Sequence, residues 1–290
     1  MSRRRCAALL TALAALLLGL STTAAQAASP RIAALTPFTA NTLSLLGIRP
    51  IAVGETLGGN EKFNRGLKSV RRLPLAHPNG ANTEQLAVMQ PDLVLSAPIW
   101  RKGNDRLEEL GIKVVESDPQ SVDEVMRQTE SIGQIVGKRA AAKRLADTQR
   151  ARVKVAKKRA RRHPTVLLVL GLGRSVQAFM PNSWGGDVIT QAGGRLLTKG
   201  LANAGEQGFA RLSDEIIVQR NPDVIIAVPH GPADNIDRIA EDLRHNAAWK
   251  NTKAAKTRRI FVSTDNTLLQ AMPQAASVIA AVQTKYLRNR

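Results

Sequence analysis

Two pairs of aromatic and cationic side chains have the chemistry to hold a small ligand. Arg101 directly follows Trp100, and Arg174 precedes Trp184 by ten positions. An aromatic ring beside a guanidinium can stack on a planar group and donate charge-assisted hydrogen bonds to an anion. We therefore expect these four residues to contact a planar or anionic chelate. The alternative is that Trp184 only packs in the core and that Arg174 is a solvated surface charge.

The chain offers no residue set for catalysis or for a resident metal. It has one cysteine, and its four histidines are too scattered for a metal site: His77, His163, His230 and His245. The turn Gly171-Leu172-Gly173 resembles a dinucleotide-binding fingerprint, but Val176 stands where the third glycine is required. The sequence also lacks a Gly-x-Ser-x-Gly nucleophile elbow. We expect a binding protein with no cofactor and no catalytic or metal-ligating residue, and not an enzyme.

Short apolar runs alternate with helical patterns along the chain. The expected strands are 32–35, 50–54, 93–96 and 112–116 in the first half and 166–170, 224–228 and 260–262 in the second. Helical segments are expected at 42–46, 107–110, 186–192 and 273–287. Strands that alternate with helices build parallel sheets. The sequence therefore predicts an α/β fold of two Rossmann-like lobes with parallel sheets.

A basic segment between the halves is predicted to join the lobes as a single long α-helix. Residues 138–162 are rich in strong helix formers, and Pro164 would end the helix. About 24 residues at about 1.5 Å each give about 36 Å, enough to cross between two lobes. The expected organisation is an N-terminal lobe at 28–137, a linker helix at 138–163 and a C-terminal lobe at 164–290. Alternatively, the segment is a nucleic-acid-binding helix, although its cations do not alternate with aromatic side chains.

The loops that follow the strands are where a ligand is expected. Ligands of open α/β sheets bind beyond the carboxyl ends of the strands. In a two-lobed molecule, those ends would face each other across a cleft. The candidate ligand-binding residues in these loops are Phe38, His77, Trp100, Arg101, Arg174, Trp184 and His230.

Residues 1–27 have the features of a secretory signal peptide. Arg3, Arg4 and Arg5 precede an apolar run, and Ala25-Gln26-Ala27 is a pattern that signal peptidase recognises. The apolar run of about 14 residues is too short to span a membrane. We expect export to the periplasm with cleavage after Ala27. Without the three arginines, 39 basic residues stand against 23 acidic ones, an excess that attracts anions.

The two halves share a repeat, Glu-x6-Pro-Asp followed by an apolar strand. It begins at Glu84 in the first half and at Glu215 in the second. In each copy a polar residue, Asn82 or Ser213, would cap a short helix with the glutamate in its first turn. The two glutamates would therefore occupy equivalent positions on the two lobes. They either serve only helix-start electrostatics or form two docking points for a basic partner surface.

These segments together resemble the iron-siderophore, haem and cobalamin periplasmic binding proteins of ABC importers. The resemblance covers residues 31–290 and rests on the order and spacing of 31–37, 84–95, 185–194, 215–226 and 245–250. It implies two lobes that move little about a rigid helix, with an iron chelate bound between them. It also implies that Glu84 and Glu215 dock onto arginines of a permease in the inner membrane.

The function expected from this resemblance is the capture of a ferric siderophore by a monomer that binds no nucleic acid. Haem or cobalamin binding is the alternative, and an exported polyanion binder is a less favoured one. Family members often carry an acidic residue in place of Asn41. Haem-binding members use a first-lobe tyrosine as axial ligand, whereas Tyr286 lies near the C-terminal end. His77 stands about where that tyrosine would fall and could replace it as the haem ligand.

Overall fold

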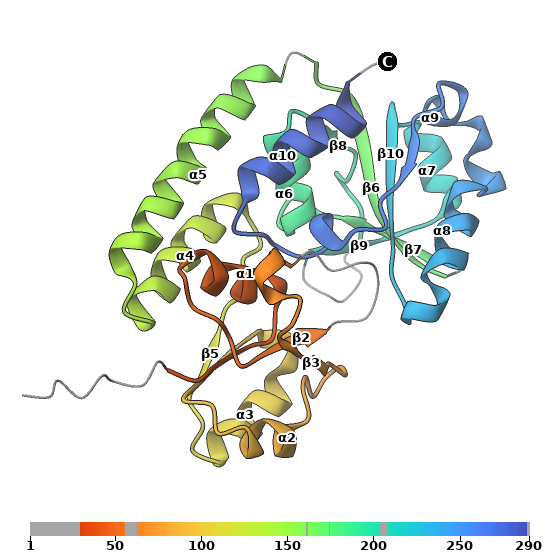
Figure 1. Cartoon of the computed structure of the whole chain (residues 1–290). Coiled ribbons are helices and arrows are strands. Elements are labelled where there is room, and N and C mark those ends of the chain that lie inside the picture. The colour runs from red at the N-terminus through yellow and green to blue at the C-terminus, as the bar shows by residue number, and fades with distance from the viewer. Residues whose placement is uncertain (1–29, 56–62, 161, 174, 203–207, 289–290) are drawn as a thin grey trace, which may run out of the picture.

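The computed structural model describes residues 30–55, 63–160, 162–173, 175–202 and 208–288. The predicted signal peptide and Arg174 lie outside the described residues. Two separate β-sheets form the molecule, each with its own helices (Figure 1). We refer to the sheet built from the first half of the chain and its helices as the N-terminal lobe, and to the other as the C-terminal lobe.

The N-terminal lobe contains a five-stranded sheet in the order β3-β2-β1-β4-β5. All of its strand pairs are parallel, as predicted. The strands are β1 (Ile32–Ala34), β2 (Ala52–Glu55), β3 (Arg71–Pro74), β4 (Leu93–Ser96) and β5 (Val114–Glu116). The helices are α1 (Pro37–Leu45), η1 (Arg65–Leu67), α2 (Thr83–Val88), η2 (Pro98–Trp100) and α3 (Arg101–Glu109).

Alternation along these strands places helices on both faces of the sheet. Ala34 belongs to the same apolar cluster as Phe38 of α1, whereas Ala33 clusters with Leu86 of α2 and Leu107 of α3. Successive side chains of a strand point to opposite faces of the sheet. Because helices cover both faces, the strands are apolar on both sides.

The sheet of the C-terminal lobe is mixed, so the predicted parallel sheet is wrong for this half. Its order is β11-β10-β6-β7-β9, with β8 also paired to β6. β7 is antiparallel to both β6 and β9. The chain returns after β6 because Gly173 adopts a φ of 77°, which glycine accommodates without strain. The strands are β6 (Thr165–Leu172), β7 (Ser175–Phe179), β8 (Arg195–Leu196), β9 (Phe209–Leu212), β10 (Val224–Pro229) and β11 (Ile260–Val262).

Helices also cover both faces of the mixed sheet. They are α6 (Trp184–Gln191), α7 (Asp214–Arg220), α8 (Ile236–Arg244), α9 (Lys253–Lys256) and α10 (Ala275–Val282). Shorter turns are η3 (Ala233–Asn235), η4 (Ala247–Asn251), η5 (Asn266–Leu268) and the π-helical η6 (Gln283–Leu287).

Two antiparallel helices, α4 (Val122–Ile135) and α5 (Arg139–Arg159), connect the sheets. Ser121 caps α4, and Gly137 with a φ of 69° lets the chain reverse into α5. Gly133 allows the close approach, since a Cβ there would lie 2.1 Å from the Cβ of Ala142. α5 lies on the outer side of the molecule beside α4 and α10 (Figure 1). It ends at Arg159, before the predicted stop at Pro164.

The internal repeat has the same backbone geometry in both lobes. Asp92 accepts a hydrogen bond from the N–H of Arg31 at 2.7 Å, and Asp223 accepts one from the N–H of Thr165 at 2.8 Å. In the N-terminal lobe, this bond joins the start of β1 to the residue just before β4. In the C-terminal lobe, it joins the start of β6 to the residue just before β10. The carboxylate thereby satisfies a backbone donor at the end of the sheet.

Asp223 is expected to make stability depend on pH in strongly acidic solution. Partial burial raises the pKa of Asp223, but bonds from Lys253 and Thr165 outweigh this and lower the pKa to about 2. A depressed carboxyl pKa stabilises the fold above the unfolded pKa and is lost as pH falls from about 4 to about 2. Asp223→Asn should cost about 1 kcal/mol at pH 7 and flatten that part of the pH profile, because solvent screens much of the ion pair.

Urea denaturation between pH 2 and pH 7 measures this effect. Asp237→Asn is the matched control, because Asp237 is an exposed carboxylate on α8. An unchanged profile in the Asp223 variant would show that its hydrogen bonds do not stabilise the fold.

Candidate functional site

The structure brings the His77 loop together with the segment that carries Trp100 and Arg101. His77 is exposed and follows β3, and Arg101 follows β4. Gly80 packs on the Trp100 ring, where a Cβ would lie 2.9 Å from the Cβ of Trp100. A Cβ on Gly103 would meet the carbonyl oxygen of Asn79 at 1.9 Å. The two glycines therefore hold these loops against each other at the carboxyl edge of the first sheet.

Arg101 and Trp100 point in different directions. The Trp100 side chain is buried in the cluster that includes Leu86. The Arg101 guanidinium is 66% exposed and pairs with Glu116 at 3.1 Å, at the end of β5. Only the guanidinium of this pair is therefore available to a ligand in this structure.

Phe38 and Trp184 also lie in the core. Phe38 is 2% exposed and Trp184 is 1% exposed, so neither ring presents a face to solvent. The indole Nε1 of Trp184 donates to the carbonyl oxygen of Thr267 at 2.9 Å. Trp184 thus fixes the loop that follows β11.

His230 directly follows β10 and is half-buried. Its backbone N–H donates to the carbonyl oxygen of Gly171 at 2.8 Å, which joins the carboxyl ends of β10 and β6. His77 and His230 therefore lie at the carboxyl edges of different sheets. In the part of the chain that the structure describes, no three histidine, cysteine or acidic residues are grouped to hold a metal ion.

A polar seam connects the two lobes, and the sequence did not predict it. Asn41 of α1 is fully buried and donates to the sulfur of Met272 at 3.7 Å. Its Oδ1 accepts the N–H of Asn64 at 2.7 Å. The Nε2 of Gln274 in turn donates to Oδ1 of Asn64 at 3.0 Å. Asn41 and Asn64 of the first half thus bond to Met272 and Gln274 of the second, which fixes one lobe against the other.

A pocket of about 420 Å³ opens at this seam, and we call it the seam pocket. The first half of the chain contributes Phe63 and Asn64 to its lining. The second half contributes Asp265, Thr267, Leu268, Met272, Gln274, Ser277, Val278, Ala281, Val282, Lys285 and Tyr286. Its volume is within the usual range for small-molecule sites.

Arg72 lies beside the seam pocket and carries an unused donor. Its guanidinium stacks 4.2 Å above the ring of Phe63, which lines the pocket. Its Nη1 is buried without a hydrogen-bond partner in the described residues. A buried donor of this kind gains free energy from any acceptor that reaches it. Arg72 is therefore a stronger candidate for anion recognition than the tryptophans.

Glu84 and Glu215 occupy equivalent exposed positions, as the repeat predicts. Asn82 caps α2 by accepting from the N–H of Gln85 at 2.8 Å, and Ser213 caps α7 by accepting from the N–H of Ile216 at 3.4 Å. Each glutamate is the second residue of its helix. A hydrogen bond from the Ser213 hydroxyl, together with a backbone N–H, lowers the pKa of Glu215.

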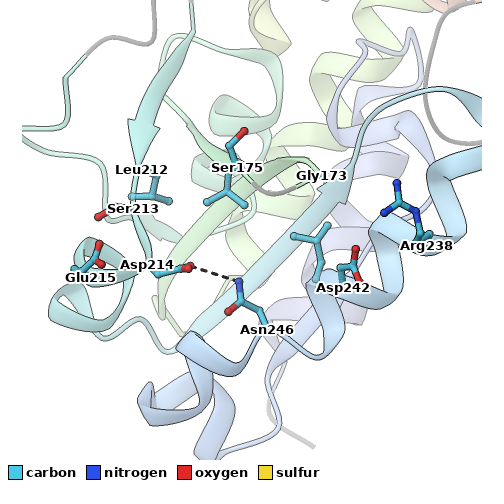
Figure 2. Close-up of a pocket in the computed structure, with 11 residues that line it drawn as sticks. Gly173, Ser175, Leu212, Ser213, Asp214, Glu215, Arg238, Asp242 and Asn246 are labelled. Atoms are coloured by element: carbon cyan, nitrogen blue, oxygen red, sulfur yellow. Dashed lines mark hydrogen bonds between the residues drawn. The ribbon is translucent and has the colours of Figure 1, made fainter.

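A wide groove of about 1000 Å³ adjoins Glu215 in the C-terminal lobe (Figure 2). Asp214 on one side accepts from Nε1 of Trp249 at 2.7 Å and from Nδ2 of Asn246 at 3.4 Å. Asp242 and Arg238 of α8 stand on the other side. Asp214 therefore has a structural role, whereas the Glu215 side chain is exposed.

A family model described as Periplasmic binding protein matches residues 32–267. The chain belongs to this family. Among curated proteins, it is 25% identical over 194 residues to the high-affinity heme uptake system protein IsdE of Staphylococcus aureus strain MRSA252. That match covers 64% of this chain and 64% of the length of IsdE.

Solved structures share the fold. The S. aureus IsdE–heme complex has a TM-score of 0.74 at 21% identity and covers 89% of this chain and 99% of that one. An ABC transporter substrate-binding protein from Listeria monocytogenes EGD-e has a TM-score of 0.72 at 20% identity, over 90% and 100%. An ABC-type Fe3+-hydroxamate transport protein from Saccharomonospora viridis DSM 43017 has a TM-score of 0.65 at 19% identity, over 88% and 92%. These likenesses identify the two-lobed α/β architecture.

Among the described residues, no helix of this family member combines the length and the apolar character needed to cross a bilayer.

Proposed function

We propose that the protein is the periplasmic substrate-binding component of an ABC importer and captures a ferric siderophore between its lobes. The observation that carries this proposal is its family membership, since the matched residues, 32–267, include the strands of both sheets. Relatives named for heme uptake and for Fe3+-hydroxamate transport support an iron chelate as the ligand. The role is binding and release as a monomer, without catalysis.

The cationic groups near the seam and the strand ends support an anionic chelate. Arg72 offers a buried donor beside the seam pocket, and Arg101 at the start of α3 offers an exposed guanidinium that pairs with Glu116. Arginine donors bind carboxylate and hydroxamate oxygens with charge-assisted hydrogen bonds. The seam bonds of Asn41 and Gln274 support the expected small lobe movement on binding.

Haem is the second candidate because IsdE, one curated relative, is named for heme uptake. Tyr286 is buried and its ring packs 5.3 Å from that of Phe261, so it is not placed to ligate iron. His77 is the exposed side chain that would take this role. A Soret band on adding haemin that is lost in His77→Ala would favour haem over a siderophore.

Ligand titration tests the proposal directly. Trp184 is hydrogen-bonded to the backbone of Thr267, which lines the seam pocket, so its fluorescence should report binding there. We expect one class among ferric siderophores, haemin and cyanocobalamin to quench tryptophan fluorescence with a Kd below about 1 µM. The absence of quenching by any of them would reject the proposed function.

Arg72→Ala is expected to weaken binding of the identified ligand by about tenfold, because it removes a buried charged donor. Arg106→Ala is the matched control, since this arginine is exposed on α3 and pairs with Glu109 at 2.8 Å. Equal affinities of the two variants would exclude Arg72 from the binding site.

Docking to a permease is proposed for Glu84 and Glu215. Both carboxylates are exposed at equivalent helix starts in the two lobes. Each lobe therefore offers one carboxylate to a basic side chain of the permease. The groove beside Glu215 gives a basic side chain of the permease room to reach it.

A further inference from the structure

The outward side of α5 is a cationic surface that neither ligand binding nor docking uses. Its inward residues pack against the rest of the protein and are small or apolar apart from one amide: Ala142, Ala146, Gln149, Val153 and Ala156. The other sides carry exposed basic residues: Arg139, Lys143, Arg144, Arg150, Arg152, Lys154, Lys157, Lys158 and Arg159. Since α5 has 21 residues, this surface extends over about 31 Å.

Most of these charges are not neutralised by the protein. Asp147 pairs with Lys143 at 2.7 Å and with Arg150 at 2.9 Å, and Glu130 pairs with Arg150 at 2.7 Å. In the described part of the chain, the other basic residues of α5 form no ion pair: Arg139, Arg144, Arg152, Lys154, Lys157, Lys158 and Arg159. We call these seven residues the α5 cationic face. The positive potential of this face therefore extends into solvent, because acidic side chains of the protein do not neutralise it.

The composition of this face favours a lipid surface over a nucleic acid. α5 contains no aromatic residue, so it offers no ring on which a base can stack. Val155 is 49% exposed between Arg152 and Lys158. An apolar side chain among cations suits the boundary between headgroups and acyl chains. Small exposed residues such as Ala151 also let the helix approach a surface closely.

We propose that the α5 cationic face binds the anionic phospholipid headgroups of a membrane surface. α5 lies on the outer side beside α10, whereas α7 and α8 lie on the opposite side of the molecule (Figure 1). A copy held through α5 therefore keeps Glu215 turned away from that membrane. Adsorption and permease docking use different orientations of the protein. The proposal does not depend on the identity of the transported ligand.

The size of the effect follows from general membrane electrostatics. Each lysine or arginine near an anionic bilayer strengthens binding by about fivefold. The attraction falls off within a Debye length of about 8 Å at physiological ionic strength, so only cations on the contacting face count. Neutralising four of the seven should lower the partition coefficient by at least about fiftyfold.

Sedimentation of the full chain with vesicles tests the proposal. The vesicles contain phosphatidylcholine alone or with about one third phosphatidylglycerol at about 0.1 M salt. The test variant is Arg152→Gln, Lys154→Gln, Lys158→Gln and Arg159→Gln. The control, with the same loss of charge from exposed sites of the N-terminal lobe, is Arg65→Gln, Lys68→Gln, Lys102→Gln and Lys113→Gln.

We expect binding to the anionic vesicles only, a drop of at least about fiftyfold in the test variant, and less than about threefold in the control. An equal drop in both variants would mean that net charge alone drives adsorption and would overturn the proposal. Tighter binding to a DNA duplex than to anionic vesicles would overturn it in favour of nucleic acid. Fluorescence quenching by the ligand is measured on the same variants. Unchanged quenching together with lost vesicle binding would show that the two properties are independent.

Discussion

Replacing Glu84 and Glu215 together by lysine should reduce ligand uptake by about a hundredfold or more while leaving ligand affinity unchanged. Each substitution places a cation where a basic partner surface is expected, so attraction becomes repulsion in both lobes. Neither residue lines the seam pocket, so ligand binding should remain intact. Uptake into cells or proteoliposomes and the fluorescence titration measure the two properties separately.

The matched control changes the same number of charges elsewhere. Glu108→Lys with Asp123→Lys alters exposed residues in each of two other helices, α3 and α4. Asp123 also lies in the first turn of its helix, so the control includes the loss of a favourable helix-start charge. Comparable loss of uptake in the control would show that helix starts or net charge, and not docking, explain the effect.

The parallel sheet of the N-terminal lobe was predictable because its central strands are short apolar runs. β3 was missed because Arg71-Arg72-Leu73-Pro74 is largely polar, as an edge strand can be. β7 was missed because the reversal depends on the conformation of Gly173 and not on any hydrophobic pattern. In contrast, α8 carries a readable signal, since Ile236, Ile239, Ala240 and Leu243 follow helical spacing.

The sequence predicted the equivalence of Glu84 and Glu215 but not the burial of the aromatic candidates in this structure. The repeat is local, because a cap, a first-turn glutamate and a Pro-Asp stop fix one backbone path in each lobe. The direction of a tryptophan after a strand depends instead on distant partners. Trp100 turns inward because Gly80 leaves room against its ring. Such packing between separate segments has no signature in a single sequence.

The seam was unpredictable for a related reason. Asn41 looked like a departure from an acidic family pattern, yet it is buried and bonded to Met272 and Asn64. An amide can donate and accept at once, which a carboxylate cannot, so it suits a buried position between two partners. Only the relative placement of the lobes assigns this role to the residue.

Trp249→Ala is expected to destabilise the C-terminal lobe by about 4 kcal/mol, the largest effect of any single substitution considered for its core. The indole is fully buried under α7 and α9, so its loss leaves a large cavity. It also removes the Nε1 donor that Asp214 accepts at 2.7 Å. Urea denaturation followed by circular dichroism measures the loss.

Trp249→Phe separates the two causes, because it keeps most of the ring volume but removes the donor, and it should cost about 1–2 kcal/mol. Equal losses in the two variants would mean that the hydrogen bond to Asp214, and not packing, dominates. Since Asp214 directly precedes Glu215 at the start of α7, both substitutions should also loosen the Glu215 carboxylate, for which docking is proposed. Uptake should therefore fall in Trp249→Phe even at temperatures where the lobe remains folded. Normal uptake at those temperatures would show that α7 does not need the hydrogen bond from Trp249.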